Sequence, residues 1–469
     1  MASTILESEF YGDGWSTAEM RAIFDDRRRY QRWLDIEAAL ARVQGNLGVI
    51  PREAAQEISR KARLENIDLD RLKTELRQTQ HSLVPLLRGL QRACAGSLGE
   101  YVHYGPTTQD IEDTGAVLEL RDALGIILRD LRAVEAVLIL LSVRHRETVM
   151  CGRTHGQQAL PITLGLKFAV WASEVRRHIE RLKEMKPRLF VGMLHGGAGT
   201  MAGLGPKALE TIAGLMRDLD LGVPDAGWGG ARDNLAEYVT HVAMAAGSVG
   251  KMVNEIFELG RTEIGEFAEA LPAGYVGSST MPHKRNPEIC EQVVMLSRVT
   301  RSHALVALEA IQAANERDSR SWRTDWWSLP ECSMMFGAML AMTKRLLTTM
   351  EIREDRIAAN LDLLRGLLLS EGLMFQLGEK IGKQTAHHVV GKVCLEAHQT
   401  GRPLRDVLRA SEEVARHLTA EQIDELLDYR KHIGCARELV DQVCRTSAEA
   451  RKTDAALLRY CNQPAESEA

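Results

Sequence analysis

The chain has 469 residues, of which 45% are hydrophobic, 26% charged and only 5% aromatic, and its formal net charge is −5. This charge excludes a general attraction to nucleic acid or to an anionic membrane surface. The longest apolar stretch, 137–141, is far shorter than the ~20 residues of a spanning helix, and residues 1–10 lack the pattern of a secretion signal. We therefore expect a cytoplasmic, mostly α-helical protein with two or three domains and no contact with membranes or nucleic acid.

The cysteines and histidines give no sign of a metal site. The eight cysteines are scattered and never form a Cys-x-x-Cys pair, which predicts buried, reduced thiols. His387 and His388 are adjacent, so on a helix they point in different directions instead of sharing one face, as the histidine pair of a zinc site does. We expect neither a metal nor another cofactor.

The N-terminal part reads as a helical domain over 1–110. Ser16 and Glu19 have the spacing of a capping box, and helical periodicity continues to about residue 100. The segment YVHYGPTTQD then interrupts the pattern with Gly105 and Pro106, which favours a domain boundary.

Long helices with short connections predict an up-down bundle as the central domain, 111–360. Two such helices are expected within 114–186, a third over 234–269 and a fourth over 288–314. Shorter helices predict a C-terminal helical domain, 361–469.

Glycine is dense in the stretch VGMLHGGAGTMAGLG, residues 191–205. No strand-turn-helix pattern surrounds it, so it is not a phosphate-binding fingerprint. We interpret it as a turn with close backbone packing.

Four irregular segments hold most of the reactive side chains. They are QTQHSLVP with His81, HYGPTTQD with Thr107 and Thr108, GRTHGQ with His155, and GSSTMPHKRNP, which spans 277–287. The glycine and prolines of the last segment predict a loop, and a loop that combines hydroxyls, a cation and an amide favours a binding site. Each segment alone is weak evidence, because a single histidine is more often structural and a single threonine is more often a helix cap.

Together these segments resemble the fumarase/aspartase superfamily, which includes adenylosuccinate lyase, argininosuccinate lyase and the 3-carboxy-cis,cis-muconate lactonizing enzyme. Residues 277–287 match the signature Ser-Ser-x-Met-Pro-x-Lys-x-Asn-Pro, while 103–110 and 152–165 resemble two further blocks of the family. The resemblance covers nearly the whole chain. It implies an all-α subunit of three helical domains, whose central five-helix bundle forms a twenty-helix core in a homotetramer. Each active site then draws its loops from three subunits.

The resemblance also implies a reaction, the removal of a proton β to a leaving group on a succinyl skeleton. Ser278 is the implied base, and its alkoxide needs nearby cations and backbone donors. His155, together with His81, is the implied acid for the leaving atom. The predicted residues that bind a small dicarboxylate substrate are Thr107, Thr108, Arg232, Ser279, Lys284, Asn286, Arg317, Trp322 and Trp326.

The pattern mixes two branches of this family. Stretches such as WRTDWWSLPE resemble the muconate enzymes, whereas His81 and His155 resemble the adenylosuccinate lyases. Trp322 and Trp326 stand where a serine and an arginine would meet a nucleotide phosphate, and two indoles cannot neutralise a dianion. We therefore expect a lyase that eliminates a nitrogen-containing group, an amine or nitrite, from a non-nucleotide substituted succinate and releases fumarate. The alternatives are a muconate-type cycloisomerase and an adenylosuccinate lyase.

Overall fold

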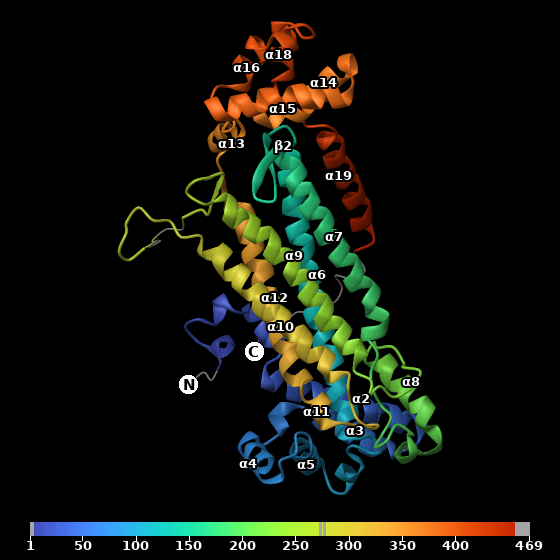
Figure 1. Cartoon of the computed structure of the whole chain (residues 1–469). Coiled ribbons are helices and arrows are strands. Elements are labelled where there is room, and N and C mark those ends of the chain that lie inside the picture. The colour runs from blue at the N-terminus through green and yellow to red at the C-terminus, as the bar shows by residue number, and fades with distance from the viewer. Residues whose placement is uncertain (1–3, 272–273, 275–277, 455–469) are drawn as a thin grey trace.

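Five long helices packed side by side form the centre and the long axis of the molecule (Figure 1). The computed structural model describes residues 4–271, 274 and 278–454. The long helices are α6 (Thr108–Arg144), α7 (Leu164–Leu189), α9 (Asp233–Leu259), α10 (Glu288–Ala310) and α12 (Asp325–Thr349). Their apolar side chains recur at helical spacing and build one large core, which includes Leu124, Ile127, Phe168, Val239 and Phe336. The predicted all-α fold with a central bundle of long helices is confirmed.

Shorter helices pack at one end of this bundle. They are α2 (Asp26–Leu47), α3 (Arg52–Lys61), α4 (Leu69–Thr79), α5 (Val84–Ala93), α8 (Ala208–Asp218) and α11 (Ser319–Trp322). Helix α1 (Ala18–Ile23) lies against the middle of the bundle, where Glu19 pairs with Arg129 of α6. Helices α2, α3 and α5 share a smaller core with the start of α6, around Trp33, Ile36 and Leu86. The predicted capping box is wrong by one residue. Thr17 caps α1 by accepting the N–H of Met20, while the Ser16 hydroxyl donates to the carbonyl of Thr17.

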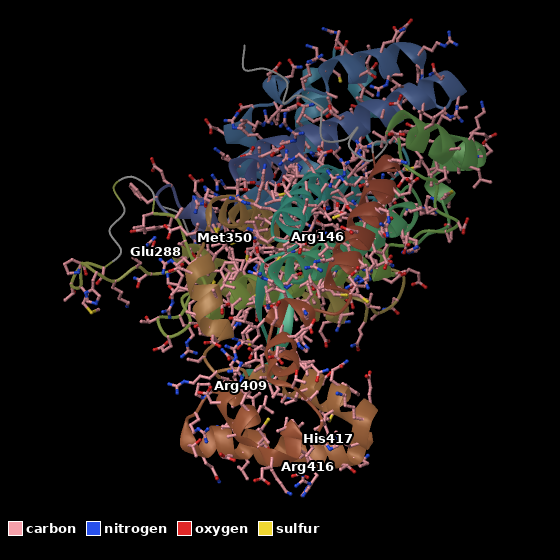
Figure 2. The ribbon with its side chains drawn as sticks, turned by 90° about the horizontal axis from the view of Figure 1, so that it is seen from above. Arg146, Glu288, Met350, Arg409, Arg416 and His417 are labelled. Carbon is pink, nitrogen blue, oxygen red and sulfur yellow. The ribbon has the colours of Figure 1, made fainter. Side chains whose placement is uncertain are left out.

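The C-terminal helices gather at the opposite end. They are α13 (Glu354–Leu361), α14 (Ser370–Ile381), α15 (Lys383–Thr400), α16 (Leu404–Ala410), α17 (Glu412–Ala415) and α18 (Ala420–Leu426). Figure 2 shows Arg409, Arg416 and His417 in this group, well away from the bundle. Helix α19 (Ala436–Lys452) then returns along α7, and Arg146 at the end of the bundle donates to its Asp441.

The segment between α6 and α7 is a β-hairpin, which the sequence did not predict. Strand β1 (Val149–Thr154) pairs antiparallel with β2 (Gln157–Thr163), and His155 and Gly156 form the two-residue turn. Both turn residues have positive φ, 52° and 74°, as a type I′ turn requires. Pro161 in β2 and Gly152 in β1 hid the pattern.

One further feature of the bundle differs from expectation. Helix α9 ends at Leu259, ten residues before the predicted end, because the following chain folds back so that β3 (Phe267–Ala268) pairs with β4 (Glu351–Ile352). The described cysteines form no disulfide, and Cys461 lies outside the described residues. The prediction of buried thiols is wrong for Cys435, which is exposed. In the described part of the chain, no helix has the combined length and apolarity to span a bilayer.

Candidate active site

The first part of the site is the start of helix α6. Thr107 is its N-cap, and the Thr107 N–H donates to Asp110 Oδ2 over 2.9 Å. The same carboxylate accepts the backbone N–H groups of His195 and Gly196, at 2.8 and 2.9 Å. Burial raises the pKa of Asp110, and these three backbone donors oppose that shift. Asp110 therefore fixes the glycine-rich segment against the helix that carries Thr107 and Thr108.

A cavity lies between this helix start and the glycine-rich segment. Thr107, Gln109, Arg317 and the backbone around 196–199 and 226–231 line it. Arg317 donates from Nε to Gln109 Oε1 over 3.0 Å and from Nη2 to the carbonyl of Gly197 over 2.8 Å. The structure thus brings Arg317 and Thr107 together, and the glycine-rich turn forms a cavity wall.

Arg232 lies in a buried network of charges. Its side chain is 1% exposed and donates to Asp113 Oδ2 over 2.6 Å and to Asp325 Oδ2 over 2.6 Å. Trp322 Nε1 donates to the other oxygen of Asp113 over 3.0 Å. Burial raises the pKa of Asp325 to about 6, although Arg232 lowers it. Asp113 and Asp325 were not predicted, since only the tertiary fold places them beside Arg232.

A second, narrower cavity adjoins this network. Its walls include Trp322, Trp326, Trp33, Arg29 and Glu112. The rings of Trp322 and Trp326 meet edge to face, with centroids 6.4 Å apart. The two tryptophans therefore share one cavity, as expected.

Arg320, near the tryptophans in sequence, and the predicted acid His81 have the following surroundings. Arg320 pairs with Asp318 at 2.8 Å, and its side chain is 82% exposed, so it faces solvent. His81 lies just before α5, where its Nδ1 accepts the N–H of Val84 over 3.2 Å. The neighbouring Ser82 lies close enough to Glu112 to lower the pKa of that carboxyl.

The signature loop carries Ser278 at its start, and Gly277 lies outside the described residues. Ser278 Oγ accepts the backbone N–H of Met281 over 2.9 Å and that of Thr280 over 3.3 Å. Two backbone donors on this oxygen are the kind of support that an alkoxide needs. Ser279 and Lys284 are exposed on the same loop.

The base of this loop is anchored to helix α10. The carboxylate of Glu269 accepts the N–H groups of Ile289 and Cys290, at 3.1 and 2.8 Å. Asn286 lines a groove beside Glu288, and Figure 2 shows Glu288 near the side of the bundle from which the loop projects. Glu269 was not predicted, because its role depends on a contact across 20 residues of chain.

Within one chain, the start of helix α6 and the hairpin that carries His155 stay apart. Helix α6 has 37 residues, which at 1.5 Å per residue separates its start from the following hairpin by about 55 Å. In Figure 1 the hairpin lies beside the C-terminal helices, whereas α11 lies at the other end of the bundle. His155 is exposed at the tip of this hairpin. A site that uses His155 and Thr108 together needs more than one chain.

Comparison with known proteins identifies the family of this chain. A family described as lyase matches residues 14–301, and one described as adenylosuccinate lyase C-terminus matches residues 366–443. The chain belongs to the fumarase/aspartase superfamily. An N-acetyl-S-(2-succino)cysteine lyase of Dickeya dadantii is 41% identical, with 95% of this chain and 98% of that protein covered.

Two other relatives represent further branches. An adenylosuccinate lyase of Methanocaldococcus jannaschii is 37% identical, with 92% of this chain and 94% of that protein covered. The crystal structure of the 3-carboxy-cis,cis-muconate lactonizing enzyme from Pseudomonas putida has a TM-score of 0.88 and 34% identity, over 94% of this chain and 99% of that one. These findings confirm the predicted superfamily and the predicted activity of a fumarate-releasing lyase that acts on a substituted succinate.

Proposed function

We propose that the protein eliminates a small, non-nucleotide thiol from a thioether of succinate and releases fumarate. Two relatives that are 41% and 42% identical over 95% and 94% of this chain are named N-acetyl-S-(2-succino)cysteine lyase, and this similarity carries the proposal. In that name the succinyl group is bonded to sulfur. We therefore prefer sulfur to nitrogen as the leaving atom.

The proposed chemistry assigns one proton to each of two side chains. Ser278, as its alkoxide, removes the proton on the carbon β to sulfur. The C–H electron pair forms the double bond of fumarate, and the C–S pair leaves with sulfur. The N–H groups of Met281 and Thr280 support the serine oxygen, and Lys284 brings a positive charge to the same loop. His155 protonates the leaving sulfur.

The leaving atom determines how much the acid contributes. A thiol has a pKa of about 8.5, so a thiolate departs with little help, whereas an amine must be protonated as it leaves. Replacing His155 is therefore expected to slow an amine-linked substrate more than a thioether.

We further propose a cytoplasmic homotetramer whose sites combine residues of three subunits. The length of α6 supports this, since it holds Thr108 and the hairpin about 55 Å apart in one chain. Large apolar side chains on the bundle also face outward in the single chain: Leu140, Val143, Val170, Met244, Leu305 and Leu308. We keep the three domains at 1–110, 111–360 and 361–469.

A second candidate is adenylosuccinate lyase. The match of residues 366–443 to the C-terminal part of that family favours it. The cavity walled by Trp322 and Trp326 opposes it, because indoles carry no charge and the arginines of this wall, Arg29 and Arg232, are already paired with carboxylates.

The test compares substrates with one enzyme preparation. Purified protein is given S-(2-succino)-N-acetylcysteine, an N-substituted aspartate, adenylosuccinate and 3-carboxy-cis,cis-muconate. Release of fumarate is followed by its ultraviolet absorbance, and loss of the muconate by chromatography. We expect the highest kcat/KM for the thioether, at or above ~10⁴ per molar per second. A faster reaction with the aspartate derivative would show that the preferred leaving atom is nitrogen and not sulfur.

A further inference from the structure

The carboxylate of Glu112 lies one turn after Thr108 on helix α6, so both side chains lie on the same face of that helix. Glu112 is only 4% exposed, and neither carboxylate oxygen has a hydrogen-bond partner of good geometry among the described residues. Burying a carboxyl group without a partner destabilises a fold. Stability therefore does not account for a glutamate at this position.

Glu112 forms part of the wall of the cavity that Trp322 and Trp326 also line. The charged neighbours are already paired, since Arg29 donates twice to Glu119, at 3.0 and 3.2 Å, and Asp113 accepts from Arg232. Apart from Ser82, which lies close enough to lower the pKa of Glu112, the described residues give this carboxylate no donor. Trp326, on another wall, is 43% exposed.

Burial raises the pKa of Glu112 to about 7. Ser82 lowers that pKa, the charge of Asp113 raises it, and the charges of Arg323 and Arg29 lower it. Near neutral pH the side chain is therefore present in part as a carboxylate, which can only accept hydrogen bonds.

We propose that Glu112 is a specificity-determining residue that accepts a hydrogen bond from an N–H group of the leaving group, and so selects leaving groups derived from amino acids. The proposal rests on the thiol elimination proposed above. The edges and faces of Trp322 and Trp326 suit an amide or ammonium group, which packs on aromatic rings and donates to the carboxylate. A leaving group without nitrogen leaves Glu112 unpaired.

The test uses three thioethers of succinate, made with N-acetylcysteine, cysteine and 3-mercaptopropionate. The first carries an amide N–H, the second an ammonium, and the third has the same thiol-to-carboxylate chain without nitrogen. For the wild type, we expect kcat/KM with the better of the first two thioethers to exceed kcat/KM with the third by roughly tenfold or more. Which of the two is better identifies the nitrogen group as an amide or an ammonium.

Variants of Glu112 test whether this residue sets the ratio. Glu112→Leu should bring the ratio close to one. Glu112→Gln keeps an acceptor and should retain part of the preference. Glu57→Gln, which alters another buried carboxylate whose partner is Arg60, is the matched control and should keep the wild-type ratio.

An unchanged ratio in Glu112→Leu overturns the proposal while the thiol elimination stands. If the wild type cleaves none of the thioethers, the proposed function fails, and the role of Glu112 is decided by binding. Calorimetry then compares the Kd values of N-acetylcysteine, cysteine and 3-mercaptopropionate for the wild type and Glu112→Leu. The role is supported if the wild type binds a nitrogen-bearing thiol more tightly than 3-mercaptopropionate and Glu112→Leu loses this preference. It is overturned if the wild type and the variant show the same order and ratio of Kd values. Thermal unfolding of each variant shows that the comparison is made on folded protein.

Discussion

Arg232 Nη1 lies 2.6 Å from Asp113 Oδ2, and both side chains are almost completely buried. The remaining guanidinium nitrogens donate to Asp113 and Asp325. Removing the cation would leave two buried carboxylates without a partner charge. We expect Arg232→Met to lower the free energy of unfolding by roughly 3–5 kcal/mol, measured by urea denaturation.

Arg320→Met is the control for this change, because its side chain is exposed and pairs with Asp318 on the surface. It should unfold at the wild-type urea concentration. If Arg232→Met also unfolded at the wild-type urea concentration, and its only change was a higher KM, Arg232 would act as a substrate ligand and not as the centre of a structural network.

Glu112 is expected to make stability depend on pH. Burial raises its pKa from 4.5 to about 7, so the folded state holds the proton more tightly than the unfolded state. The contribution of the protonated group is complete below pH 4.5, falls as the pH rises toward 7 and is lost above it. Glu112→Gln should match the wild type near pH 5 and exceed its stability at pH 8 by roughly 2–3 kcal/mol, measured by urea denaturation. A variant that is less stable at pH 8 would show that Glu112 has a partner in solution.

Ser278→Ala should abolish turnover and leave the fold intact, because the variant lacks the proposed base and its loop contributes little to the core. Fumarate release and thermal unfolding measure the two effects. Thr280→Val is the control, since it keeps the backbone N–H that donates to Ser278 Oγ. More than about a tenth of wild-type activity in Ser278→Ala, a loss below ~1.4 kcal/mol in the barrier, would remove Ser278 from the role of base.

The proposed sharing of sites among subunits predicts recovery of activity on mixing. Ser278→Ala and His155→Asn chains are each expected to be nearly inactive with an amine-linked substrate. Tetramers assembled from both should regain part of the activity, because some sites receive an intact Ser278 from one chain and an intact His155 from another. Light scattering gives the assembly size. A lack of recovery after verified exchange would mean that both residues come from one chain.

The long helices could be predicted because their evidence is local. In α10, apolar residues such as Val293, Leu296 and Ala307 repeat over many turns of one segment. The hairpin could not be predicted, since its pairing of Val149 with Thr163 depends on residues 14 apart and its strands lack a clear alternation.

Among the candidate site residues, those in family motifs were accessible from the sequence, and those defined by tertiary contacts were not. Ser278 and His155 fall in short matched blocks. Asp110 and Glu112 gained significance only when the fold placed the former beside His195 and left the latter buried without a partner. A glutamate in the first turns of a helix is otherwise an ordinary solvated residue.

The two tryptophans separate the proposed thiol elimination from adenylosuccinate cleavage. Trp322 Nε1 donates to Asp113 over 3.0 Å, which fixes that ring, while Trp326 is 43% exposed and tolerates replacement. The wild type should neither bind nor cleave adenylosuccinate, because two indoles offer a phosphate dianion no charge and the arginines of the cavity wall are paired with Glu119 and Asp113. Trp326→Arg should introduce measurable binding of AMP by calorimetry, since a guanidinium can pair with phosphate, and Trp326→Phe should not. A wild-type kcat/KM for adenylosuccinate above roughly 10⁴ per molar per second would instead establish the nucleotide as a substrate and show that other groups neutralise its phosphate.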